Sequence, residues 1–264
     1  MYLRGRDSVA SIGIRKEEIM KRVKLTVAYD GTNYHGWQIQ PNGNTIEAEL
    51  NRHLTELLGE EISVVGASRT DAGVHALGNV AVFDTRARMP ADKISYAMNT
   101  RLPADIRIQD SCEVAADFHP RFCRTVKTYE YRILNRRFPD PTKRLYSFFY
   151  YYPLDVEKMR EAGAYLVGEH DFQSFCTKKP GQENTVRIIY SLNIEKEGDM
   201  IVLRVTGNGF LYNMVRIIAG TLIRAGGGFF SPEYMNTILE GRDRELAGET
   251  ARPEGLTLVE IKYI

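Results

Sequence analysis

One carboxylate in this chain has the surroundings that a reacting group needs. Asp71 lies in the segment Ala67-Ser68-Arg69-Thr70-Asp71-Ala72-Gly73-Val74-His75-Ala76, two residues after a basic side chain and directly before a flexible Ala-Gly step. β-Branched, apolar runs precede this segment at 62–65 and follow it at 79–83. The spacing predicts that Asp71 lies at a turn beside a strand end, on a rigid support with open space in front of it. Reacting groups are usually displayed in such places.

Three interpretations fit a carboxylate in this position. A turn aspartate that hydrogen-bonds its own backbone is the commonest of them. A metal ligand paired with His75 is the second, but no further His, Cys or Asp cluster lies nearby in the sequence to complete the site. A lone catalytic carboxylate is the third, acting as nucleophile or proton acceptor. In that role Asp71 needs a cationic partner that keeps it ionised in a dry pocket.

The candidate partner is Arg216, which interrupts an apolar helical stretch, Met214-Val215-Arg216-Ile217-Ile218. A charge in such a place is costly unless an opposite charge meets it. The pattern therefore predicts a buried carboxylate facing Arg216. Gly220, one turn further along, leaves room for a group to approach that face of the helix. The alternative is a surface arginine at the edge of the helix.

The strand expected at 126–134 alternates aromatic residues with basic and polar ones, in the order Lys127-Thr128-Tyr129-Glu130-Tyr131-Arg132. Aromatic faces can stack on unpaired bases, and lysine or arginine can bind a nucleic-acid backbone. The alternative is a core face made of Tyr129 and Tyr131, with solvated residues on the opposite face.

The net charge of +1 conceals a local excess of basic residues. Between positions 121 and 144 only Glu130 and Asp140 oppose eight basic side chains: Arg121, Arg124, Lys127, Arg132, Arg136, Arg137, Lys143 and Arg144. A basic stripe on an otherwise neutral protein is the footprint of a groove for a polyanion. The alternative is an edge strand that lysine and arginine keep soluble.

The composition excludes several classes of protein. The 264 residues are 43% hydrophobic and 26% charged, which is typical of a soluble globular protein. No apolar run approaches the roughly 20 residues of a membrane span, and residues 1–16 lack the apolar core of a secretory signal. Three cysteines without metal spacing favour a reducing cytosol. No phosphate loop, dinucleotide fingerprint or nucleophile motif points to an NTPase, a dehydrogenase or a triad hydrolase.

Periodicity predicts more strands than helices. Residues 1–20 are interpreted as an N-terminal extension outside the fold. Strands are expected at 23–29, 62–65, 79–84, 106–114, 126–134, 146–152, 186–195, 200–206 and 256–263. Helices are expected at 46–58 with Asn44 as cap, at 91–100, 155–167 and 212–225, and after Pro232. Because the strands do not alternate strictly with helices, the pattern indicates an α+β fold, with two similar halves and mostly antiparallel mixed sheets flanked by helices.

The segment 68–76 resembles the catalytic segment of the tRNA pseudouridine synthase A family. The resemblance runs in order from about Lys21 to the C-terminus. It includes 29–32 with 36–38, Asp117-Phe118-His119-Pro120-Arg121-Phe122, 127–132, Asp171-Phe172-Gln173-Ser174-Phe175, 207–220 and 254–256. Two positions depart from the family pattern: Ser68 replaces a usual glycine, and Pro120 replaces a usual alanine.

The resemblance implies a function and a domain organisation. It implies isomerisation of uridine to pseudouridine at positions 38, 39 and 40 of the tRNA anticodon stem-loop, by a cytoplasmic homodimer that uses no metal or small-molecule cofactor and does not associate with membranes. It also implies a pseudouridine-synthase-like fold with the active-site cleft between two halves. The N-terminal half, 21–115, would carry the catalytic aspartate, and the C-terminal half, 116–264, the stacking tyrosine and the partner arginine.

The resemblance also implies roles for individual residues. Asp71 matches the catalytic nucleophile, Arg69 the arginine that helps extrude the target nucleotide, Tyr129 the tyrosine that stacks on the target base, and Arg216 the arginine that pairs with the carboxylate. Leu256 is expected to wall the pocket; Arg121 and Lys127 are expected to contact the substrate. Two alternatives stay open: a catalytically silent RNA-binding module on the same scaffold, and a metal-dependent phosphoesterase that uses Asp71 and His75.

Overall fold

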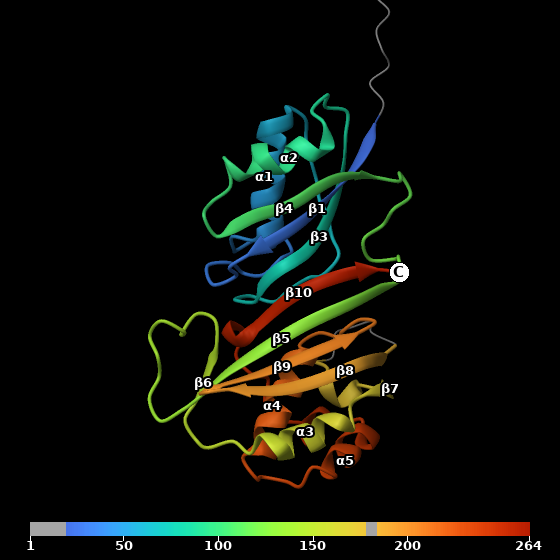
Figure 1. The fold of residues 1–264 in the computed structure, drawn as a ribbon. Coiled ribbons are helices and arrows are strands. Elements are labelled where there is room, and N and C mark those ends of the chain that lie inside the picture. The colour runs from blue at the N-terminus through green and yellow to red at the C-terminus, as the bar shows by residue number, and fades with distance from the viewer. Residues whose placement is uncertain (1–19, 178–183) are drawn as a thin grey trace, which may run out of the picture.

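The computed structural model describes residues 20–177 and 184–264. The extension expected at 1–20 lies outside the described residues except for Met20. Among the described residues ten strands form one sheet, in which the order along the main path is β4-β1-β3-β10-β5-β9-β8-β7. Figure 1 shows this twisted sheet with α1 and α2 beside its upper strands and α3, α4 and α5 beside its lower ones.

The elements have the following bounds. The strands are β1 (Lys21–Tyr29), β2 (Val65–Gly66), β3 (His75–Thr85), β4 (Ile106–Val114), β5 (Thr125–Asn135), β6 (Phe148–Tyr150), β7 (Gly168–Asp171), β8 (Val186–Glu197), β9 (Met200–Gly207) and β10 (Leu256–Tyr263). The helices are α1 (Ile46–Leu58), α2 (Ala91–Asn99), α3 (Val156–Ala164), α4 (Met214–Gly226) and α5 (Tyr234–Gly241). Short 3₁₀ turns lie at Gln173–Phe175, Arg244–Leu246 and Pro253–Gly255.

The last strand of the chain, β10, lies in the middle of the sheet. β10 lies between β3 and β5, parallel to β3 and antiparallel to β5. Its register places Thr257 opposite His75 and Leu258 opposite Tyr129. The other pairings are antiparallel except the short contact between β5 and β6. The α+β class with a mostly antiparallel sheet and flanking helices is therefore confirmed.

Apolar side chains gather in two clusters. One packs α1 and α2 against β1 and β3 and includes Leu25, Trp37 and Leu50. The other packs α3, α4 and α5 against β5, β8 and β9 and includes Ile217 and Leu222 among its buried residues. The half-buried ring of Tyr129 contacts both clusters, so it lies where they meet.

Two local predictions around α1 are wrong. Thr45, not Asn44, caps the helix, and its hydroxyl accepts a hydrogen bond from the Ala48 N–H. The strand expected at 62–65 is reduced to β2, although its apolar side chains are buried. The reason is that side chains of α1 take the place of a neighbouring strand: Thr55 Oγ1 accepts from Ile62 N and Asn51 Oδ1 accepts from Val64 N.

Three further boundaries differ from the prediction. The strand expected at 146–152 covers only β6, because the side-chain amide of Asn135 donates to the carbonyls of Tyr150 and Tyr152. The helix expected at 155–167 begins as predicted, with Asp155 as its cap, but α3 ends at Ala164 in a tighter turn. β7 follows directly and was not predicted.

The basic stripe does not lie on an edge strand. β5 is an interior strand between β10 and β9, so the edge-strand alternative is wrong. The stripe divides instead: Arg132 lies on one face of β5, Lys127 points into the protein, and Arg137, Lys143 and Arg144 lie on the loop that leads to β6. In the part of the chain that the structure describes, no helix is long and apolar enough to cross a bilayer.

Candidate active site

Asp71 lies in the turn between β2 and β3, here called the Asp71 loop (67–74). Its first residues are held by Asn79, a fully buried amide on β3. The Asn79 side chain accepts a hydrogen bond from Ser68 N and donates one to Ser68 O at 3.0 Å. The Ala67 N–H donates to the Val80 carbonyl at 2.7 Å. A β-strand thus supports the loop from behind, as the sequence pattern predicted.

A second segment, residues 31–37, supports the far side of the loop. Trp37 N donates to the Thr70 carbonyl at 3.0 Å, and Gly73 N donates to the Tyr34 carbonyl at 3.2 Å. Gly36 makes this contact possible, because it has φ +87° and a Cβ there would lie 2.6 Å from the Thr70 oxygen. The backbone around Asp71 is therefore fixed before any substrate binds.

The structure brings Arg216 from α4 to Asp71. Nη1 of Arg216 lies 3.3 Å from Oδ2 of Asp71, and the side chains are 16% and 20% exposed. The same guanidinium donates through Nε to the Ala251 carbonyl at 2.7 Å and through Nη1 to Asn213 Oδ1 at 3.1 Å. Three separate segments of the chain, at Asp71, 213–216 and Ala251, therefore fix one ion pair in a partly desolvated place.

The Ala251 carbonyl can reach Arg216 because Gly220 leaves a gap in the surface of α4. A Cβ on Gly220 would lie 1.9 Å from the Glu249 carbonyl oxygen, so only glycine lets the segment 248–251 cross the helix this closely. The backbone then returns to Arg216, where Ala251 N donates to the Arg216 carbonyl at 3.1 Å. The space expected beside Gly220 is filled by this crossing segment.

Tyr129 lies on β5 close to the Asp71 loop. Its ring meets Phe210 edge-on, with centroids 5.1 Å apart and an 80° angle between the planes. Burial raises the pKa of the Tyr129 hydroxyl to about 12; hydrogen bonding with Ser68 opposes this shift, and the negative charge of Asp71 adds to it. Tyr129 is therefore a neutral, rigidly packed ring at neutral pH.

Lys127, two residues before Tyr129 on β5, points into the protein. Its Nζ donates to the Ala67 carbonyl at 3.1 Å and to Ser68 Oγ at 2.9 Å. Burial, together with the smaller effect of the positive charge of Arg121, lowers the pKa of this amine to about 8. The cation expected to contact substrate thus holds the Asp71 loop in this structure.

The remaining predicted site residues surround this centre at different depths. Arg69 is exposed, and its Nη1 contacts Gln38 Oε1 at 3.4 Å. Arg121 is also exposed, on the loop where His119 stacks on Phe122 with ring centroids 4.0 Å apart. Leu256 is buried at the start of β10, in the same apolar cluster as Val74 from the Asp71 loop. Arg69 and Arg121 therefore lie at the surface, whereas Leu256 belongs to the apolar core that also contains Val74.

Comparison with known proteins places the chain in a family. The model of a family described as tRNA pseudouridine synthase matches residues 25–123 and 162–264. The chain is 46% identical over 244 residues to tRNA pseudouridine synthase A of Thermoanaerobacter sp. (strain X514), and 47% identical over 244 residues to that of Brevibacillus brevis. Both alignments cover 92% of this chain and 100% of the relative.

The chain belongs to the tRNA pseudouridine synthase family. It is accordingly an isomerase that converts uridine to pseudouridine in tRNA. Among solved structures, the archaeal box H/ACA sRNP Nop10-Cbf5 complex aligns with a TM-score of 0.32 and 12% identity, over 89% of this chain and 46% of that one.

The metal hypothesis required His75 to act together with Asp71, but the carboxylate that His75 contacts is that of Asp30. Its Nδ1 lies 3.1 Å from Oδ1 of Asp30 and accepts a hydrogen bond from the Gly31 N–H. The Tyr146 hydroxyl donates to the other oxygen of Asp30 at 2.6 Å. Among the described residues no group of three or more His, Cys, Asp or Glu side chains has the arrangement of a metal site. His75 thus anchors the end of the Asp71 loop of this pseudouridine synthase.

Sequence reasoning missed Asn79 and Ser68 as parts of the synthase site. The signal for Asn79 was available, because a buried amide in the apolar strand Asn79-Val80-Ala81-Val82-Phe83 needs partners for its hydrogen-bonding groups. Ser68 was noted only as a departure from the family. No local pattern pointed to Ala251, which contributes a backbone oxygen and no side chain.

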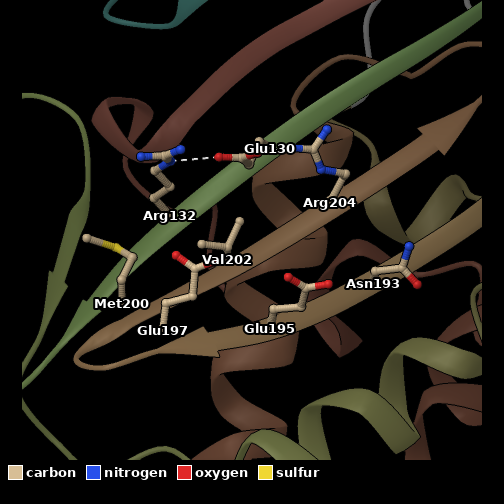
Figure 2. A pocket seen from close by; sticks show the side chains of 8 residues that line it. All are labelled: Glu130, Arg132, Asn193, Glu195, Glu197, Met200, Val202 and Arg204. Atoms are coloured by element: carbon tan, nitrogen blue, oxygen red, sulfur yellow. Dashed lines mark hydrogen bonds and ion pairs between the residues drawn. The ribbon is translucent and has the colours of Figure 1, made fainter.

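One hollow of the synthase lies away from this centre. Figure 2 shows it on the open face of β5, β8 and β9, lined by Glu130, Arg132, Asn193, Glu195, Glu197, Met200, Val202 and Arg204. Glu130 is 7% exposed, and its two oxygens each contact an arginine, Arg132 and Arg204, at 2.7 Å. Because residues alternate along β5, this hollow opens on the face opposite Tyr129 and Lys127.

Proposed function

We propose that this chain isomerises uridine at positions 38, 39 and 40 of the tRNA anticodon stem-loop, as a homodimer without metal or cofactor. The observation that carries the proposal is the ion pair between Asp71 and Arg216, made beside the ring of Tyr129. A carboxylate next to a fixed cation and an aromatic ring suits a reaction on one extruded nucleoside. The high identity to tRNA pseudouridine synthases A over their whole length supports the same function.

Each residue takes one role in this proposal. Asp71 is the nucleophile, and Arg216 keeps it ionised and aimed. Tyr129 stacks on the target base, while the exposed guanidinium of Arg69 occupies the space that the target nucleotide leaves in the stem-loop. Leu256 supports the apolar wall formed by Val74. Arg121 supplies positive charge beside the RNA backbone, and Lys127 holds the Asp71 loop in position.

The reaction balances without a co-reactant. The bond between C1′ of the ribose and N1 of uracil breaks, the base rotates, and a bond forms between C1′ and C5. The proton on C5 is lost and N1 gains one, so nothing is added or removed overall. An ionised Asp71 can begin this sequence by attacking C1′, by attacking the base, or by taking the 2′ proton to give a glycal.

Extrusion of the target base must be compensated by the protein. Removing a nucleotide from its stack costs a few kcal/mol. A base stacked on an aromatic side chain regains about 1–3 kcal/mol, and contacts to the phosphate backbone supply the rest. The rigid packing of Tyr129 against Phe210 favours this role, because little conformational freedom is lost when the base arrives.

We further propose that residues 21–115 and 116–264 act as two halves that enclose the target nucleoside. Asp71 comes from the first and Arg216 and Tyr129 from the second, so one ion pair joins them. We place the enzyme in the cytoplasm, where tRNA is modified. The three cysteines are free thiols in the structure, which agrees with a reducing compartment.

The test is to map pseudouridine in an unmodified tRNA transcript after incubation with this protein alone, by carbodiimide chemistry or mass spectrometry. We expect new pseudouridine at positions 38, 39 and 40 wherever the transcript carries uridine there, in buffer containing a chelator. Product at other positions would overturn the site assignment. Tight tRNA binding without product in any transcript would favour the catalytically silent RNA-binding module instead.

A further inference from the structure

A second hollow opens beside the Asp71 loop. It lies between the loop that joins β5 to β6 and the 3₁₀ turn before β10, and its lining is Leu134, Pro139, Asp140, Arg144, Ser147, Phe148, Phe149, Arg252 and Glu254. In Figure 1 the β5–β6 loop projects from the left edge of the sheet, on the side where β10 begins. The hollow therefore shares an edge of the sheet with the proposed active site.

Two contacts fix how near the hollow is to Asp71. On one side Pro253 packs against the Asp71 loop: a Cβ at Gly73 would lie 3.0 Å from the Pro253 ring. On the other side Tyr146 is pinned by its hydrogen bond to Asp30, and its ring lies 5.2 Å from that of His75. Pro253 and Tyr146 are the sequence neighbours of lining residues on the two walls, so the hollow lies near the Asp71 loop.

The lining combines groups that bind a nucleotide. Arg144 and Arg252 are exposed and supply guanidinium donors for a phosphate. The half-buried ring of Phe149 supplies an apolar surface for a base. Phe148, its neighbour on β6, points to the other face of the strand and packs against the apolar core. The two carboxylates are engaged within the protein: Asp140 Oδ1 accepts hydrogen bonds from Thr142, and Glu254 Oε1 lies 2.9 Å from Arg252 Nε.

The rim of the hollow extends the same chemistry. Arg137 lies over the ring of Phe138 at 5.0 Å, and the rings of Tyr151 and Tyr152 meet at 5.2 Å. Phe138 is 61% exposed and Tyr152 65% exposed. Exposed aromatic rings among arginines form a common surface for single-stranded RNA, since every base has a face that can stack. Around the hollow, five basic side chains (Arg136, Arg137, Lys143, Arg144 and Arg252) outnumber three acidic ones (Asp140, Asp199 and Glu254), so the local net charge is positive.

We propose that this hollow is a second nucleotide subsite, which binds an unpaired RNA nucleotide close to the target uridine in the substrate. Arg144 and Arg252 bind its phosphate, and its base rests on Phe149. The inference rests on the proposed function, because it takes the RNA substrate to enter at the Asp71 loop. It adds an anchoring position that carries no reacting group.

The experiment compares Arg144→Gln, Arg252→Gln and the double variant with the wild type. Loss of two phosphate contacts is expected to lower kcat/KM for tRNA by about 10-fold or more and to reduce the slope of log Kd against log salt by about 1.4. The single-turnover rate at saturating enzyme should stay within about twofold, since neither arginine touches Asp71. Arg52→Gln is the matched control, because Arg52 is an exposed arginine on α1 that is paired with Glu49 and Glu56.

Each outcome decides the proposal. A lower kcat/KM together with a smaller salt slope in the double variant, and neither in Arg52→Gln, supports the subsite. An unchanged salt slope overturns it, even if activity falls, because the arginines would then act on folding or on the loop alone. Failure of the proposed function gives a different result: the wild type itself would form no pseudouridine, and the salt slopes of the variants would still report on the hollow.

Discussion

The two carboxylates Asp71 and Glu130 lie on different faces of one sheet and are held in different ways. Glu130 contacts two arginines at 2.7 Å, and its side chain is 7% exposed. Asp71 contacts Arg216 through one oxygen at 3.3 Å and is 20% exposed. A carboxylate with both oxygens in short ion pairs has little capacity left for a substrate. The longer contact between Asp71 and Arg216 and the greater exposure of the Asp71 side chain keep a charge in place while leaving it accessible, which is what a reacting group requires.

The arginines that contact the two carboxylates also differ in what holds them in place. Arg132 and Arg204 are about half exposed and are held mainly by Glu130 itself. Arg216 is held by Ala251 and Asn213 independently of Asp71. A guanidinium that is positioned by other groups needs no rearrangement when the carboxylate reacts, and such preorganised charges contribute most to catalysis.

The largest effect is expected from exchanging each carboxylate for its amide. Asp71→Asn should lower the rate of pseudouridine formation by at least about 10³-fold, because the nucleophile is lost, while the Kd for tRNA changes little. Glu130→Gln should leave the rate within about threefold and lower the free energy of unfolding by about 1 kcal/mol, since its arginines stay solvated. Single-turnover assays, filter binding and urea unfolding make the comparison. Equal loss of activity in both variants would refute the assignment.

A smaller effect is expected from exchanging the arginines for lysine. Arg216→Lys should lower kcat by about 10²-fold, because one ammonium cannot reach both the Ala251 carbonyl and Asp71 in the geometry of a guanidinium fork. Arg204→Lys, on the other face of the sheet, should leave kcat unchanged. KM should move little in either variant. Wild-type kcat in Arg216→Lys would show that charge alone, without orientation, suffices at this position.

The parts of this site that neighbouring residues in the sequence determine could be predicted from the sequence. Arg216 was singled out because an arginine among apolar helical residues must find a partner, and the structure places it beside Asp71. The strand after Asp71, β3, was indicated by its β-branched run. The cap at Thr45 and the short β2 could not be predicted, because each depends on which of several nearby side chains accepts from a backbone N–H: Thr45 from Ala48 N, and Thr55 from Ile62 N.

The rest of the site depends on contacts between distant parts of the chain. The position of β10 between β3 and β5 places Leu256 in the apolar core that also contains Val74, and nothing in the strand's own pattern selects those neighbours. The contribution of Ala251 could not be predicted, because a backbone carbonyl leaves no mark in the side-chain pattern. For Lys127, alternation along β5 already placed it on the same face as Tyr129, so an inward direction could have been expected.

Lys127 offers the mildest test, because it acts on the position of the Asp71 loop. Lys127→Met should lower kcat about 10-fold and leave KM for tRNA nearly unchanged if its contacts to Ala67 and Ser68 position the loop. A contact to the RNA backbone would instead raise KM and reduce the salt slope. Lys262→Met on β10 is the control, because that lysine is exposed and paired with Glu260.

The lowered pKa of Lys127 adds a second measurement. Burial brings this pKa to about 8 from the ordinary 10.5, so between those values the unfolded chain binds more protons than the folded one. The free energy of unfolding of the wild type should therefore rise with pH from about 8 to 10.5, relative to Lys127→Met, by on the order of 1–3 kcal/mol. Below pH 8 both states carry the charge and the difference should be constant. A difference that stays flat up to pH 10.5 would show that Lys127 is solvated, and that the Asp71 loop does not depend on it.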